Sequence, residues 1–177
     1  MNALQETFID ELKDIYDAEH QIVKALPDLI EAATHEELKS GLQEHLEETH
    51  EHIKRVEQVF RIFEETPKRK KCKGTAGLLE EGHEIIKENR GDAALISAAQ
   101  KVEHYEIASY GSLSAWARLL DKEEAAELLE ANLNEEKLAD EKLTEVAENV
   151  VNLDEREETE EAEPAGRLAR HRAASRK

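Results

Sequence analysis

The chain has 177 residues, of which 42 are Asp or Glu and 24 are Lys or Arg, for a formal net charge of −18. Such an acidic chain disfavours nucleic acid as a partner, because phosphate binding needs a basic surface. The single cysteine, Cys72, excludes an intramolecular disulfide and a cysteine-rich metal site. No stretch approaches the ~20 apolar residues of a membrane span, and the N-terminus lacks the features of a signal peptide. We therefore expect a cytoplasmic protein without membrane contact.

The N-terminal part predicts two long helices, over residues 8–33 and 38–63. Their apolar residues recur at alternating spacings of three and four, which keeps one side of each helix against a partner. Pro27 should kink the first helix in its C-terminal third. Thr34 is predicted to cap the second helix, with Glu37 three residues later completing a capping box.

A long connection follows, with a basic loop around Cys72, a shorter helix over residues 77–89 and a turn. The cysteine is interpreted as a free loop residue. Two more long helices are predicted over residues 95–117 and 129–150. Because the joints near Thr34 and Asp121 are short, the long helices should pair as two antiparallel hairpins. We predict an all-α fold, an antiparallel four-helix bundle whose two hairpins are joined by a long crossover with a short extra helix.

The bundle should occupy residues 1–152, and residues 153–177 should form a separate tail. That tail begins with a run of acidic residues and ends in a basic segment. Segregated charge of this kind is typical of a disordered segment.

Five acidic residues interrupt the apolar stripes of the long helices, namely Glu19, Glu103, Glu106, Glu136 and Asp140. Burying one ionised carboxylate without a partner costs several kcal/mol, so a chance cluster is implausible. Counting outward from the two hairpin turns places Glu19 level with residues 48–52, Glu106 level with Glu136, and Glu103 level with Asp140. Acids at one height on two hairpins are typical of a metal pair held inside a bundle.

The second helix offers several candidate ligands at this height. At about 100° per residue, His45 and His52 lie within about 60° of Thr49 at the centre of the inward face. Glu48 and His50 lie about 100° to opposite sides. We predict His45 together with Glu48, three residues apart on one side, and keep His50 and His52 as alternatives.

Simpler interpretations exist for each residue alone. A single Glu in a helix stripe is usually at the edge with its head in water, and a single inward His is usually packed in the core. Five acids in register, with no inward Lys or Arg beside them, favour the metal interpretation. Oxygen-rich ligation with one or two imidazoles suits iron or manganese better than zinc.

Three segments resemble the ferritin-like YciF/YciE family of bacterial stress proteins: residues 100–111 (QKVEHYEIASYG), 45–49 (HLEET) and 17–19 (DAE). The resemblance covers roughly residues 3–152. It implies a ferritin-superfamily bundle, a homodimer, a di-iron or di-manganese centre, and induction under stress.

In the wider superfamily, helices one and three each supply a Glu, while helices two and four each supply Glu-x-x-His. Glu19 and Glu106 (or Glu103) match the single-Glu positions. The fourth helix departs from the pattern, because Ala139 stands three residues after Glu136. On the second helix, the better-placed pair has the His before the Glu.

The first functional hypothesis is a dinuclear iron or manganese protein of the stress response that reduces O2 or peroxide. Its ligands or bridges would be Glu19, Glu48, Glu106 and Glu136, with Glu103, Asp140 and His45 completing the set. The second hypothesis is a structural or interaction protein that keeps the scaffold without turnover. The register of the acids supports a metal site, whereas the histidine-poor ligand set does not indicate a particular reaction.

Overall fold

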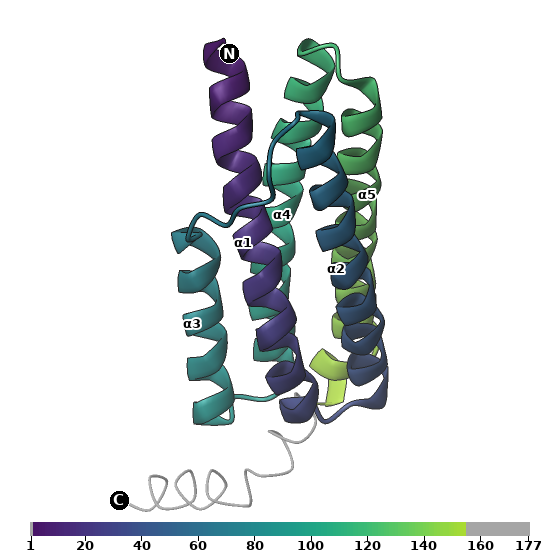
Figure 1. Ribbon diagram of the computed structural model, residues 1–177. Coiled ribbons are helices and arrows are strands. Elements are labelled where there is room, and N and C mark those ends of the chain that lie inside the picture. Colours follow the sequence, from purple (N-terminus) through teal and green to yellow (C-terminus); the bar gives the residue numbers. More distant parts are fainter. Residues whose placement is uncertain (1, 155–177) are drawn as a thin grey trace, which may run out of the picture.

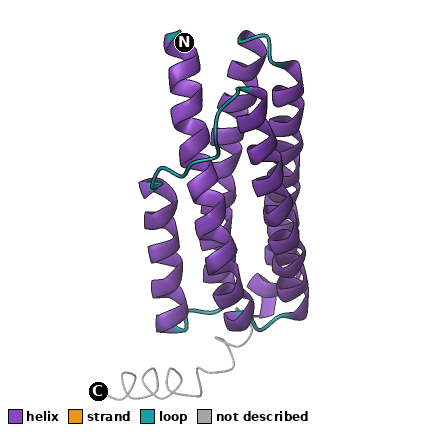
Figure 2. Cartoon of the chain, in the orientation of Figure 1, coloured by secondary structure: helices purple, strands orange, loops and turns teal. Residues whose placement is uncertain are grey.

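The computed structural model describes residues 2–154, and every regular element in that range is helical (Figures 1 and 2). Five α-helices are followed by a short π-helical turn: α1 (Ala3–Ala32), α2 (Glu36–Ile62), α3 (Lys73–Glu88), α4 (Asp92–Leu119), α5 (Glu123–Val146) and η1 (Ala147–Val151). No helix within residues 2–154 is both long and apolar enough to cross a membrane. The predicted disordered tail lies outside the described residues, except for positions 153 and 154.

Four long helices form the bundle, and the predicted fold class is confirmed. Helices α1 and α2 make one hairpin and α4 and α5 make the other, with further packing of α1 on α4 and of α2 on α5. The shorter α3 lies outside this ring and packs on α1 and α4 (Figure 1). It starts four residues earlier than predicted, at Lys73, and forms the centre of the long crossover.

Asp92, the first residue of α4, ties the two hairpins together. Its carboxylate accepts hydrogen bonds from the backbone N–H groups of Thr34 (3.0 Å) and His35 (2.8 Å) and from the Thr34 hydroxyl (2.9 Å). The predicted cap at Thr34 is therefore wrong. Its hydroxyl is committed to Asp92, and α2 begins after His35, which makes no side-chain capping bond.

Polar contacts around Cys72, which the sequence did not indicate, anchor the loop that leads into α3. Cys72 is buried and caps α3, because its Sγ accepts the Thr75 N–H at 3.4 Å. Its own N–H donates to Asp17 (2.9 Å), which also accepts from Arg69 Nε (2.7 Å). Sγ further lies 3.0 Å from the Tyr105 hydroxyl. Cys72 is a free cysteine in the loop, as predicted, but it is not without a role, because it caps α3 and joins the loop to Asp17 and Tyr105.

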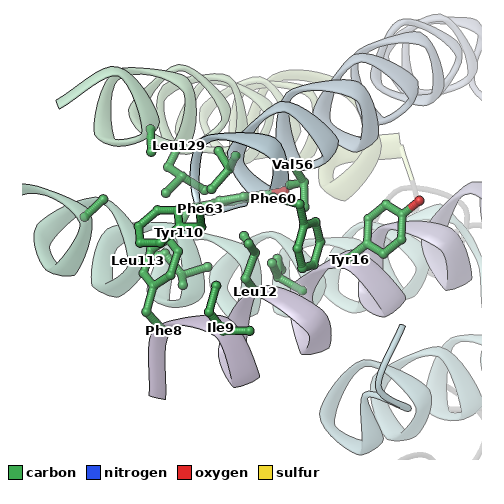
Figure 3. Close-up of a cluster of buried hydrophobic side chains, with 14 of the residues drawn as sticks. Phe8, Ile9, Leu12, Tyr16, Val56, Phe60, Phe63, Tyr110, Leu113 and Leu129 are labelled. Carbon is green, nitrogen blue, oxygen red and sulfur yellow. The ribbon is translucent and has the colours of Figure 1, made fainter. Parts of the chain in front are cut away.

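The apolar core is divided into two clusters along the bundle axis. The first contains Phe8, Leu12, Phe60, Tyr110, Leu113 and Leu129 among others (Figure 3). The second contains Ile22, Leu26, Leu38, Leu42, Leu95 and Leu143 among others. Burial of each large side chain contributes roughly 1.5–3 kcal/mol. Between the clusters, at the level of Glu19, the interior becomes polar.

Candidate metal centre

Six polar side chains from all four long helices fill this layer, and each is at most 5% exposed. They are Glu19 from α1, His45 and His52 from α2, Glu103 and Glu106 from α4, and Glu136 from α5. The two histidines are seven residues apart and the two α4 glutamates three apart. Both spacings return a helix to about the same face, so the two pairs of side chains point inward together. We call these six residues the polar layer.

The donor atoms of the polar layer form two groups that share one residue. The first group holds His45, Glu103, Glu106 and Glu136, and the second holds Glu19, His52 and Glu136. Within each group one donor atom per residue lies within 4.8 Å of all the others. Glu136 therefore stands where it could contact two cations at once.

Nitrogen atoms of both histidines lie within 4 Å of carboxylate oxygens of the layer. His52 Nδ1 lies 2.9 Å from Glu136 Oε1 and 3.6 Å from Glu19 Oε1. His45 Nε2 lies 3.4 Å from Glu103 Oε1 and 3.8 Å from Glu136 Oε2. Two donor atoms that are each about 2.1 Å from an ion and at right angles to one another are about 3.0 Å apart.

Eight buried nitrogen and oxygen atoms of these six residues have no hydrogen-bond partner. They include both oxygens of Glu106 and both oxygens of Glu136. An unsatisfied buried polar group costs about 1–3 kcal/mol, and more when it is charged. Such a concentration at one point fits divalent cations, because each cation could satisfy several of these atoms together.

The pKa shifts of the residues in the polar layer also fit bound cations. Burial raises the pKa of Glu103, Glu106 and Glu136, and repulsion from neighbouring carboxylates adds to this effect. Burial lowers the pKa of His45, but Glu103, Glu48 and Glu19 together outweigh it and the net shift is upward. For His52 burial is again outweighed, and neighbouring carboxylates raise its pKa from 6.5 to about 11. The metal-free layer thus holds protons at positions where cations would displace them.

A second set of residues holds His52 in place. Its Nε2 lies 2.8 Å from Glu135 Oε2, and Arg55 Nη2 donates to the other Glu135 oxygen at 2.9 Å. Because the carboxylate accepts from both, Nε2 carries a proton, and Nδ1 faces the polar layer, where a cation would displace its proton. A histidine whose outer nitrogen is bound to a carboxylate is the usual arrangement of a metal ligand.

Tyr110 contacts the layer from the first apolar cluster. Its hydroxyl donates a short hydrogen bond to Glu19 Oε1, and its side chain is fully buried. Burial, followed by the Glu19 charge, raises the pKa of Tyr110 well above its ordinary value. The phenol therefore stays protonated and orients one oxygen of Glu19.

Of the residues predicted as ligands, Glu19, His45, Glu103, Glu106 and Glu136 come together in the polar layer. Glu48 does not join them, since its side chain is 36% exposed and its nearest contact to the layer is 3.7 Å, to His45 Nδ1. Asp140 is also at the edge, where it accepts a hydrogen bond from Gln100 (3.1 Å) and lies 3.3 Å from His104.

Among the alternatives on the second helix, His52 is in the layer and His50 is exposed. The sequence pattern did not single out Glu135. The available signal in the sequence was its position next to Glu136, whereas its contacts to His52 and Arg55 on α2 follow from helix packing.

A closed ring of two helical hairpins around a carboxylate–histidine layer defines a ferritin-like helical protein. Residues 3–155 match the family described as a domain of unknown function, DUF892, and the chain belongs to this family. Protein YciF of Escherichia coli K12 is 47% identical over 157 residues, which cover 86% of this chain and 95% of that protein.

Solved structures show the same fold. The crystal structure of the E. coli stress protein YciF has a TM-score of 0.80 and covers 84% of this chain and 97% of its own. YcfI, a suggested structural protein of Rhodopseudomonas palustris, is 44% identical with a TM-score of 0.78, covering 81% of this chain and 94% of its own. A Xanthomonas campestris protein is 25% identical with a TM-score of 0.68, and covers 89% and 99% respectively.

Proposed function

We propose that the polar layer binds two divalent cations, iron or manganese, and that the protein uses them to reduce O2 or peroxide during stress. The observation that carries the proposal is the set of eight buried donor atoms without partners. Oxygen donors with two imidazoles suit iron and manganese. The stress role rests on the 47% identity to E. coli YciF, which is described as a stress protein.

The residues divide the work by position. Glu136 belongs to both donor groups and would be shared by the two cations. His45, Glu103 and Glu106 would hold one cation, and Glu19 and His52 the other. Bound iron or manganese would supply the electrons and an open coordination position.

The surroundings control water and protons. The apolar clusters on either side of the layer limit solvent access, which strengthens electrostatic interactions inside. Reducing one peroxide to two water molecules consumes two electrons and two protons. Protons held by the carboxylates leave as cations bind, so binding should be tighter at higher pH and should release protons to the solvent.

Metal analysis and an oxidation assay test the proposal. Protein produced with iron and manganese supplements should contain about two ions per chain by elemental analysis, and it should oxidise added Fe²⁺ faster than buffer does. Glu106→Gln should lose both properties, whereas Glu47→Gln, at an exposed site on α2, should keep them. If the protein contains neither metal and oxidises Fe²⁺ no faster than buffer does, the proposal is wrong. The hypothesis of a structural or interaction protein without turnover would then remain.

The family resemblance also leads us to propose that the protein is a cytoplasmic homodimer. Light scattering on the purified full chain should give twice the chain mass of 20.1 kDa. A single-chain mass across the working concentration range would contradict this.

A further inference from the structure

A cavity between α2 and α5, which lie side by side in the bundle (Figure 1), leads to the polar layer. Its volume is about 30 Å³, which is enough for a water molecule, and it is open to solvent. Its walls are mainly apolar and include Leu38, Leu42 and Leu143, with Gly41 and Ala139 as small residues between them. His45 and Glu103, two members of the polar layer, also line it.

Donor atoms without partners stand at the inner end of this cavity. His45 Nδ1 and Glu103 Oε2 are buried and accept or donate no hydrogen bond, and their residues are 5% and 4% exposed. The inner end therefore carries a nitrogen and an oxygen donor that a cation could bind. The cavity joins the solvent to the group formed by His45, Glu103, Glu106 and Glu136.

Charged residues stand at the outer end. Glu37 is exposed and Glu48 half-buried, and both line the cavity. Lys142 also lines it, but its ammonium lies 3.3 Å from Glu44, outside the cavity lining. Glu48 Oε2 is 3.7 Å from His45 Nδ1, which exceeds hydrogen-bonding distance. Glu48 thus lies between the solvent and the first buried donor.

We propose that this cavity is the route by which divalent cations reach the polar layer, and that Glu48 receives each cation and passes it to His45. The proposal rests on the proposed function, because a route requires a site to serve. It gives Glu48 a position along the path instead of a permanent place among the ligands. A carboxylate at the mouth of a low-dielectric cavity attracts cations and raises their local concentration.

Gly41 provides the means to close the route. A Cβ added at Gly41 would have no atom within 4 Å, so the first atom of a larger side chain would meet open space at the cavity wall. Leucine also favours a helix more than glycine does, and Gly41 is inside α2. Gly41→Leu should therefore fill the cavity without lowering the melting temperature.

Gly77 offers a matched control. A Cβ there also meets no atom within 4 Å, and the residue lies in α3, away from the cavity lining. Gly77→Leu makes the same chemical change in the same kind of element. Any effect of the substitution type alone would appear in this variant too.

Stopped-flow absorption with Co²⁺ as the probe measures the rate of uptake by the full-length metal-free protein. Gly41→Leu should slow both uptake and release into chelator by at least about tenfold, because a filled route in a close-packed bundle opens only by fluctuation. The amount of Co²⁺ bound at equilibrium should match that of the wild type. Gly77→Leu should have wild-type rates.

Glu48→Gln gives a second, independent measurement. It keeps the cavity open but removes the charge at its mouth, so uptake should slow by roughly tenfold and lose much of its dependence on salt. If both Gly41→Leu and Glu48→Gln take up Co²⁺ at the wild-type rate, the route is wrong although the site stands. If the wild type binds no Co²⁺, the proposed function and the route both fail.

Discussion

Glu106→Gln should stabilise the metal-free protein while abolishing its response to metal. Glu106 is fully buried, and neither of its oxygens has a hydrogen-bond partner. Burial and three neighbouring carboxylates raise its pKa well above the ordinary value of 4.5. The folded metal-free chain therefore keeps a proton on this carboxyl to higher pH than the unfolded chain does.

The free energy needed to keep this proton on Glu106 sets the gain in stability expected for Glu106→Gln. Each pH unit above the unfolded pKa adds about 1.4 kcal/mol to the cost of keeping the group protonated. Since pH 7 is about 2.5 pH units above 4.5, keeping Glu106 protonated at pH 7 costs the fold up to about 3.5 kcal/mol. Glutamine has the same shape and no such cost. At roughly 2–4 °C per kcal/mol, the variant should melt several degrees higher than the wild type in chelator.

The difference in stability between the wild type and Glu106→Gln should depend on pH. A group whose pKa is raised on folding stabilises the fold fully below its unfolded pKa, and that contribution is lost as pH rises through the folded pKa. Wild type and Glu106→Gln should therefore be equally stable near pH 4.5, and the difference should widen up to pH 7. Denaturant unfolding in chelator at a series of pH values measures this difference.

Metal should invert the order of stability. A cation at a thousand times its dissociation constant stabilises the folded state by about 4.1 kcal/mol, which exceeds the cost of the Glu106 proton, and only the wild type should gain this. Glu47→Gln, at an exposed position, should change stability by less than about 0.5 kcal/mol at every pH. If Glu106→Gln is less stable than the wild type in chelator at pH 7, the carboxylate is held ionised and this reasoning is refuted.

Three further substitutions test other parts of the structure. Glu135→Gln should weaken metal binding by about 10–100-fold, because it loosens the partner that orients His52; isothermal titration measures this, and unchanged affinity would contradict the role. Asp92→Ala should destabilise the fold by about 1–3 kcal/mol, because buried N–H groups of Thr34 and His35 lose their acceptor, yet metal content should stay the same. Burial lowers the pKa of His52, but neighbouring carboxylates outweigh it and raise the pKa from 6.5 to about 11. The metal-free wild type should therefore lose stability as pH rises across that interval, and His52→Gln should lose less. Parallel curves of unfolding free energy against pH for the two proteins would count against the charged imidazole.

Patterns within single helices were sufficient to predict much of the fold. Apolar spacing marked the four long helices, and short joints paired them as hairpins, because both features depend on local geometry. The same periodicity made Glu19, Glu106 and Glu136 conspicuous as charges on inward faces. Counting from the hairpin turns placed them at one height, since each residue adds a constant rise along a helix.

On the second helix, the sequence did not determine which side chains face the interior. A rotation angle describes a side chain relative to its own helix axis, so it does not state how far the helix is turned toward its neighbours. Packing of α2 against both α1 and α5 decides that His45 and His52 face inward and that Glu48 remains at a cavity mouth. Asp140 was predicted in the layer but lies at its edge for a similar reason. Its helix, α5, buries Glu136 and Ala139 instead.

The chain by itself determined that the protein is a helical bundle with acid at mid-height, because periodicity and register are properties of consecutive residues. Only the tertiary structure decided which donors converge, that Glu136 belongs to two groups, and that Glu135 supports His52 from outside. It also revealed the burial of Cys72 and the cavity beside Gly41. These features join residues from different helices, and their positions depend on helix packing that no single segment encodes.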